Sequence, residues 1–136
     1  MSINRFSKFV SLMIIITILT ASCSSGKSYI NTSVGEITVM RFEIVDELFG
    51  GFKPDKPGLV ILLISFESKD GGRIDGFDEA SKNVFLTNSS GDRYEIDVVG
   101  WEYQEDYLGF AIPEQESVLM LNWPGNDPIP IEIQGQ

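Results

Sequence analysis

Residues 101–107 bring together the side chains that could bind or act on a sugar. The segment holds three aromatic rings and three carboxylates: Trp101, Tyr103, Tyr107, Glu102, Glu105 and Asp106. Aromatic faces stack on sugar rings, and two carboxylates at a specific separation divide the acid and base roles of glycoside hydrolysis. Binding is favoured over catalysis because stacking needs no such fixed separation. The alternative is a loop whose rings cap the end of the fold while the acids face water.

A second acidic segment, residues 70–79, supplies the oxygen ligands and glycine turns of which calcium loops are made. Its candidate ligands are Asp70, Asp75 and Asp78. The spacing fails the EF-hand template, because Gly72 and Ile74 occupy the third and fifth ligand positions. Acidic turns of this kind are usually solvated, so we predict neither a metal nor a cofactor, with these aspartates as the calcium candidates to be tested.

A Pro/Gly-rich loop at residues 49–58 carries two phenylalanines, Phe49 and Phe52. Binding residues tend to lie in loops on a rigid scaffold, so exposed rings here would form a patch for a partner. The alternative is that both rings cover the first half of the apolar strand that begins at Leu59, whose outer face needs a cover. The solvent exposure of the two rings distinguishes these interpretations.

The composition removes several kinds of catalysis. The chain has no histidine, which excludes a Ser-His-Asp triad, a histidine-ligated zinc and a histidine general base built from its own residues. Cys23 is the only cysteine, so the chain forms no internal disulfide. Carboxylate, lysine and tyrosine chemistry remain. We predict that the protein is not an enzyme.

The first 22 residues have the three parts of a signal peptide. Arg5 and Lys8 precede an apolar run at residues 9–19, and small residues follow it. The run is shorter than the roughly 20 apolar residues that a transmembrane helix needs. The lipobox of bacterial lipoproteins is similar to the segment that ends the leader, Leu19-Thr20-Ala21-Ser22-Cys23, although Thr20 stands where leucine is commonest. This resemblance implies cleavage before Cys23 and attachment of diacylglycerol and a further acyl chain, such as palmitate, to that cysteine.

Lipidation implies a location at a membrane. Two or three acyl chains anchor a protein stably, at about 0.8 kcal/mol per buried methylene, so we expect an extracytoplasmic protein on the cell membrane or outer membrane. Residues 23–33 then serve as the lipidated cysteine and a flexible tether. Cleavage takes Lys and Arg from 10 to 8 against 20 acidic residues, a net charge of −12. Such a charge repels nucleic acid and leaves an envelope protein or glycan as the expected partner.

Residues 34–136 are predicted to form one all-β domain. Turn residues separate seven short runs rich in branched and aromatic residues, at 35–45, 59–67, 83–88, 92–99, 107–112, 117–123 and 129–133. No segment of useful length has helical periodicity. This pattern favours an antiparallel β-sandwich of about seven strands and of the immunoglobulin type, with a small barrel as the alternative.

Alternation within the runs predicts which side chains face the core. Tyr94, Ile96 and Val98 share one face, with Val84 and Leu86 inward on the partner strand. The longest apolar run points a continuous set toward the core: Val60, Leu62, Ile64 and Phe66. Leu59, Ile61 and Leu63 then need a second cover, from the loop at 49–52 or from a partner subunit. Pro130 cannot donate to a ladder, so we expect the last strand to lie at an edge or to leave that position unpaired.

Three segments of the domain resemble successive strands of one family. They are residues 58–66, 84–94 and 110–113, which are similar to strand and turn patterns of small immunoglobulin-like domains common in bacterial surface lipoproteins and related to a secreted immunoprotective antigen. Ser68-Lys69-Asp70-Gly71-Gly72 departs from the asparagine-rich turn that is common there. The resemblance implies a fold and no catalytic residue, since a fold does not define an activity.

These observations lead to one expected function and one alternative. The expected function is a membrane-anchored, non-catalytic binding module of the cell envelope. Its candidate contact residues are Phe49, Phe52, Trp101, Tyr103 and Tyr107. The alternative is a carbohydrate-binding or carbohydrate-active protein that uses residues 101–107, and its catalytic form requires two of the three carboxylates in one cleft.

Overall fold

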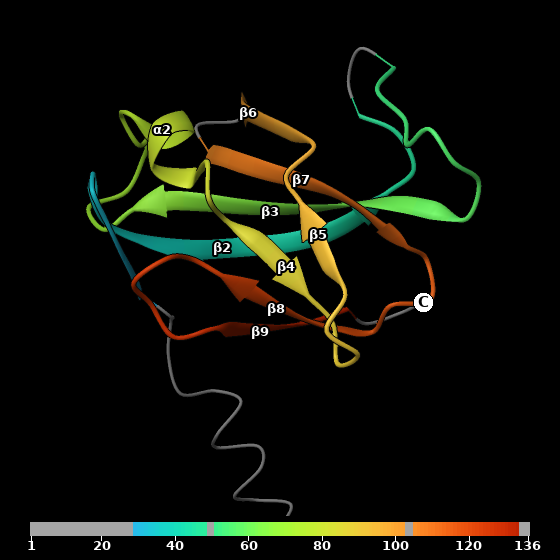
Figure 1. Ribbon diagram of the computed structural model, residues 1–136. Coiled ribbons are helices and arrows are strands. Elements are labelled where there is room, and N and C mark those ends of the chain that lie inside the picture. The colour runs from blue at the N-terminus through green and yellow to red at the C-terminus, as the bar shows by residue number, and fades with distance from the viewer. Residues whose placement is uncertain (1–28, 49–50, 103–104, 134–136) are drawn as a thin grey trace, which may run out of the picture.

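The computed structural model describes residues 29–48, 51–102 and 105–133 (Figure 1). A short helix, α2 (Phe77–Ser81), lies between the third and fourth strands. The strands are β1 (Tyr29–Thr32), β2 (Gly35–Val45), β3 (Leu59–Ser68), β4 (Phe85–Thr87), β5 (Arg93–Glu95), β6 (Val98–Glu102), β7 (Glu105–Pro113), β8 (Val118–Asn122) and β9 (Ile129–Glu132). In this part of the chain no helix is long and apolar enough to cross a membrane.

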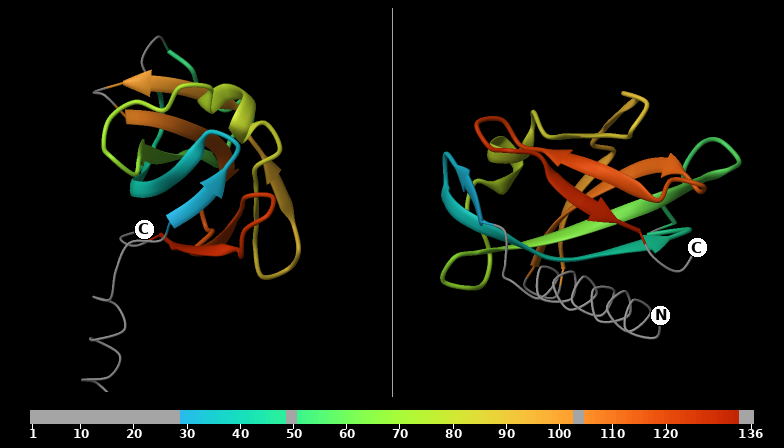
Figure 2. Two further views of the ribbon diagram at one scale, coloured as in Figure 1. Left: turned by 90° about the vertical axis from the view of Figure 1, so that its left-hand side faces the viewer. Right: turned by 90° about the horizontal axis from the view of Figure 1, so that it is seen from below.

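The strands form two antiparallel sheets that face each other across one apolar core (Figures 1 and 2). One sheet has the order β1-β2-β3-β7-β6 and the other the order β5-β4-β8-β9. The predicted all-β, immunoglobulin-like sandwich is confirmed. The described residues contain nine strands, against about seven predicted, because β1 was not foreseen and the predicted strand at 92–99 is divided into β5 and β6.

The core is built on β3, the central strand of the larger sheet. Val60, Leu62, Ile64 and Phe66 all point into it, as their alternation predicted. At one end of the sandwich Phe66 meets the rings of Phe77 and Trp123, with centroids 5.5 and 5.7 Å away. Phe77 belongs to α2, which therefore closes this end. A five-residue helix is too short to show a helical period in the sequence, so α2 was not predicted.

The strand after Asn88 was predicted only in part. Tyr94 and Ile96 pack against the core, and Val84 and Leu86 point inward, all as expected. Val98 does not point into the core as predicted. It lies on the outer face of the larger sheet, where it pairs with Gly109.

The reason is that the chain changes sheets at Asp97. The Asp97 backbone N–H donates to the carbonyl of Gly109 at 2.9 Å, and its carboxylate accepts a hydrogen bond from the Ala111 N–H at 2.7 Å. These two bonds attach the chain to β7 in the other sheet, so the alternation of β5 does not continue into β6.

The outer face of the larger sheet covers itself. Ile61 is fully buried although it lies outside the core cluster. A Cβ at Gly109 would collide with Val98 and would also touch Leu63 and Ile61. The missing side chain thus makes room for Val98 to lie flat over the sheet and exclude water from Ile61. At Ile61, neighbouring side chains therefore contribute cover of the kind that we had expected from the loop at 49–52 or from a partner subunit.

The ordered domain begins earlier than predicted. The expected tether ran to residue 33, but the structure places its last part in the sheet as β1, which pairs with β2 from Tyr29↔Thr38 to Thr32↔Gly35. Ile30 is fully buried in the core. Four residues with a single apolar side chain facing inward give too little pattern to be recognised as a strand. Cys23 and the rest of the predicted tether lie outside the described residues.

Candidate functional site

The aromatic and acidic segment at residues 101–107 is a hairpin rather than an open loop. Trp101 of β6 pairs with Asp106 of β7, and Glu102, the last residue of β6, pairs with Glu105, the first of β7. The turn between them, which includes Tyr103, and the side chain of Glu102 lie outside the described part of the structure. Because the segment is two paired strands, its side chains alternate between the two faces of the larger sheet.

The two described carboxylates of this hairpin point to opposite faces. Glu105 lies on the outer face, where a carboxylate oxygen is 3.2 Å from an Arg41 guanidinium nitrogen. Asp106 follows directly and therefore points toward the interior, where it is only 4% exposed. Its carboxylate accepts a hydrogen bond from the Ile74 N–H at 2.8 Å. Glu105 and Asp106 therefore do not share a cleft and cannot act as a catalytic pair.

Asp106 has a structural role in this arrangement. Burial raises the pKa of its carboxyl group, while the hydrogen bond from Ile74 and the positive charge of Arg73 lower it. Asp78 and Asp75 add a smaller upward shift of the same pKa. The carboxylate attaches the segment before α2 to β7, because it accepts a backbone N–H that would otherwise be buried without a partner.

Of the two aromatic rings that the structure describes in this segment, Trp101 is the more exposed. It is 49% exposed, and the Arg73 guanidinium lies 4.9 Å from the ring centroid. This cation–π contact holds the indole at the end of the sandwich, next to the segment that Asp106 attaches. Tyr107 differs, because its half-buried ring lies over Gly100, where any Cβ would collide with it. Trp101 is therefore available for contact, whereas Tyr107 belongs to the packing of the sheet.

The calcium candidates do not form a site. Asp70 is exposed in the turn after β3, and Asp75 and Asp78 are exposed around the start of α2. Among the described residues, no group of three or more acidic, histidine or cysteine side chains is arranged to hold a metal ion.

The loop after β2 forms an arm that projects from the sandwich (Figure 1). A bridge between Leu48 and Phe52 joins the two sides of the arm, and Lys53 lies 3.5 Å from a carboxylate oxygen of Glu47. Phe52 is 39% exposed, which agrees with the contact interpretation better than with a role as cover. Phe49 lies outside the described residues.

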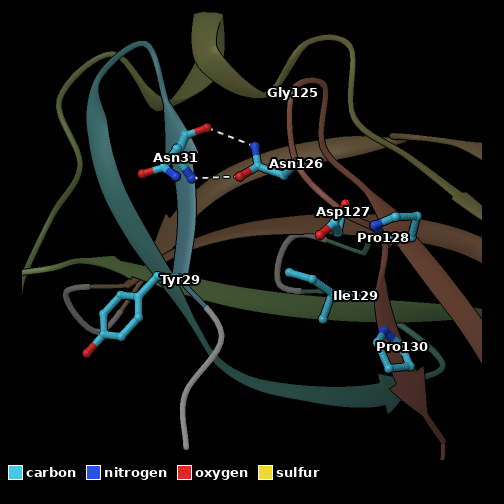
Figure 3. Close-up of a pocket in the computed structure, with 8 residues that line it drawn as sticks. All are labelled: Tyr29, Asn31, Gly125, Asn126, Asp127, Pro128, Ile129 and Pro130. Carbon is cyan, nitrogen blue, oxygen red and sulfur yellow. Dashed lines mark hydrogen bonds between the residues drawn. The ribbon is translucent and has the colours of Figure 1, made fainter.

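The structure also contains a groove that the sequence did not predict. It has a volume of about 510 Å³ and is lined by Tyr29, Asn31, Gly125, Asn126, Asp127, Pro128, Ile129 and Pro130. Figure 3 shows the Asn126 amide turned toward Asn31, and the Tyr29 ring pointing away from it. The amide accepts from the Asn31 backbone N–H at 2.9 Å and donates to the Asn31 carbonyl at 2.8 Å. In the sequence, the cluster of turn residues at 124–128 indicates a loop at this position, but it does not reveal that β1 lies beside that loop.

Comparison with known proteins adds no relative, since no protein-family model, no curated protein and no solved structure matches the chain.

Proposed function

We propose that this protein is a lipoprotein anchored at Cys23 whose β-sandwich is a non-catalytic binding module of the cell envelope. The observation that carries the proposal is the state of Trp101, half exposed and held in place by Arg73, while the carboxylates described beside it are engaged elsewhere. Tryptophan and arginine are the residues that most often dominate binding energy at interfaces. The contact surface is therefore centred on Trp101, with Phe52 on the projecting arm as a second, separate contact.

The anchor sets what this module can reach. Five residues lie between Cys23 and Tyr29, where β1 begins, and the six residue steps would span about 20 Å in an extended chain. The domain is thus held close to the bilayer surface, and its partners are molecules of the envelope. The signal peptide and lipobox support this location, and substitution of Cys23 by serine tests it. The variant should no longer incorporate labelled palmitate and should leave the membrane fraction; a variant that keeps both properties contradicts the anchor.

Affinity capture from native membranes tests the binding function. The lipidated full chain serves as bait, beside Trp101→Ala, Phe52→Ala and the matched control Val118→Ala, which changes another exposed apolar residue in the opposite sheet. We expect Trp101→Ala to reduce recovery of the principal partner at least about tenfold, as for a residue that dominates an interface, while Val118→Ala has no effect. Equal recovery by all four chains would contradict a contact surface at Trp101 and at the arm.

A glycan is the second candidate ligand, and the polar groups of the groove in Figure 3 favour it. Asn31 and Asp127 supply amide and carboxylate groups that can bond to sugar hydroxyls, and the exposed Tyr29 ring, which points away from Asn126, lies at the margin of the groove. Retention of the purified chain on immobilised envelope polysaccharide tests this candidate. Retention that is lost in Tyr29→Ala or Trp101→Ala would assign the ligand as a glycan, whereas absence of retention leaves a protein partner.

A further inference from the structure

One half of β2 has an edge that no described residue pairs with. On one side β2 pairs with β3 up to Val45, and on the other side it pairs with β1 only as far as Thr38. Residues 39–45 therefore carry backbone N–H and C=O groups along a free edge seven residues long. A free edge of this length is a template for a further strand.

This edge is also unusually apolar for a solvent-exposed strand. Met40 is 37% exposed and Phe42 is 40% exposed. The register with β3 places Phe42 opposite Ile64, on the side of the sheet that carries the core, and places Arg41 and Glu43 on the outer side. An exposed edge rich in large apolar side chains is a site of association unless another strand covers it.

A second copy of the chain can cover the free edge by symmetric pairing. A two-fold axis normal to the sheet pairs the edge with its own copy in antiparallel orientation and keeps the two core-bearing faces on the same side. The register centred on Phe42, the middle residue of the span 39–45, places Phe42 against the partner's Phe42. Arg41 then lies opposite the partner's Glu43, and Glu43 lies opposite the partner's Arg41.

Charge selects the same register. Oppositely charged side chains directly across an antiparallel pair stabilise it, and like charges destabilise it. Centring the pair on Arg41 would place two arginines opposite each other, and centring it on Glu43 would place two glutamates opposite each other. Only the register centred on Phe42 matches both charges. The β-bulge at Met40 ends the regular pairing on that side, which limits the ladder to a short central stretch.

We infer that the free edge of β2 is a homodimer interface, in which two copies of this chain join their larger sheets through antiparallel pairing centred on Phe42. A ladder this short is a small interface for a protein free in solution. Confinement to one membrane surface would raise the effective concentration of the copies, as tethering does for linked binding sites, and so favour the pairing.

Site-specific cross-linking in membranes tests the interface directly. In the full chain with Phe42→Cys, the two new thiols face each other across the axis. Opposed residues in an antiparallel pair have Cα atoms about 4.5 to 5.5 Å apart, within the range of a disulfide. After mild oxidation we expect the Phe42→Cys chain to form at least tenfold more disulfide-linked dimer than either of two controls. The wild type controls for Cys23, and Val118→Cys is a matched variant with a new cysteine at another exposed position. Phe42→Cys dimers no more abundant than in these controls would overturn the inference.

Charge reversal gives a second measurement that does not depend on the cysteine. In liposomes that hold the lipidated full chain, energy transfer between labelled copies measures dimerisation, and Arg41→Glu should weaken it about tenfold because two attractive pairs become repulsive. Adding Glu43→Arg should restore it. Glu105→Gln breaks the intramolecular ion pair of Arg41 and should leave dimerisation unchanged.

Two further outcomes would assign the free edge of β2 to an occupant other than a second copy. A cross-link from Phe42→Cys to a different protein would assign the edge to that partner and overturn the dimer. A monomer in which Ser28→Cys forms a disulfide with Val39→Cys would show instead that the segment before β1 extends along β2. Trp101→Ala should not change the cross-link, so failure of the dimer and failure of the binding surface at Trp101 are distinguishable.

Discussion

The two faces of the larger sheet bury apolar side chains by different means. The inner face, which carries Phe66 and Phe110, is covered by the second sheet and closed at one end by α2. The outer face has no second layer among the described residues, yet Ile61 is as inaccessible to solvent as the core residues. There, glycines let neighbouring side chains lie flat on the sheet. The comparison teaches that a strand apolar on both faces does not require two covering layers when its neighbours include glycine.

The largest effect should come from the inner face. Phe66 is fully buried and contacts the rings of Phe77 and Trp123, so Phe66→Ala should lower the free energy of unfolding by about 3 to 5 kcal/mol. Denaturant titration followed by tryptophan fluorescence measures it. Val118→Ala, in the second sheet and half exposed, should cost under about 1 kcal/mol. Similar losses for the two variants would show that the aromatic cluster does not hold this end of the sandwich.

The outer face should respond next, through overpacking. Gly109→Ala places a methyl group where Val98 lies, and we expect a loss of about 1 to 3 kcal/mol in the free energy of unfolding. Val98→Ala removes the colliding group, so the same glycine substitution should cost much less in that background. A double-mutant cycle measures this coupling. Additive losses would mean that Val98 does not occupy the space at Gly109.

A third effect concerns Asp106, the carboxylate that points to the inner side. Asp106→Ala removes the acceptor of the Ile74 N–H and should cost about 1 to 3 kcal/mol, whereas Asp106→Asn keeps an acceptor oxygen and should cost less.

The same residue predicts a pH dependence. Because burial raises its pKa in the folded state, the native protein binds this proton more tightly than the unfolded chain. The contribution of Asp106 to stability is therefore greatest at low pH and decreases as pH rises from the unfolded value of 3.8 through the folded pKa. Unfolding titrations across this window should show a shallower decline in Asp106→Asn than in wild type. An identical profile would contradict a raised pKa.

The smallest effect should be that of Glu105, the neighbouring carboxylate on the outer side. Its ion pair with Arg41 is largely solvated at the arginine end, so Glu105→Gln should change the free energy of unfolding by under about 1 kcal/mol, and less in high salt. Denaturant titrations at low and high ionic strength measure this difference. A loss as large as that of Asp106→Ala would mean that the outer ion pair matters as much as the buried carboxylate.

Strands with a strong local pattern were predictable from the sequence. β2 begins and ends where predicted, and β3 extends one residue further. The hairpin between β4 and β5 also follows local chemistry, because the Asn88 side chain accepts hydrogen bonds from the N–H groups of Ser90 and Asp92. These features depend on residues close in sequence, so turn chemistry and alternation are sufficient to locate them.

The candidate site was less predictable. The aromatic segment at 101–107 was recognised, but its hairpin pairing, which separates Glu105 from Asp106, depends on a strand alternation that the loop interpretation missed. The groove beside Tyr29 unites residues almost one hundred positions apart, through Asn126 and Asn31. No local pattern contains that contact.

The sequence by itself determined the all-β class, the inward set on β3 and the absence of histidine and disulfide chemistry. Tertiary structure decided which sheet each strand joined, which carboxylate was buried and which half of β2 kept a free edge. The physical reason is the distance along the chain over which each effect acts. Alternation and turn preference act between neighbours along the chain, whereas burial and strand pairing depend on which distant segments come together in the folded protein.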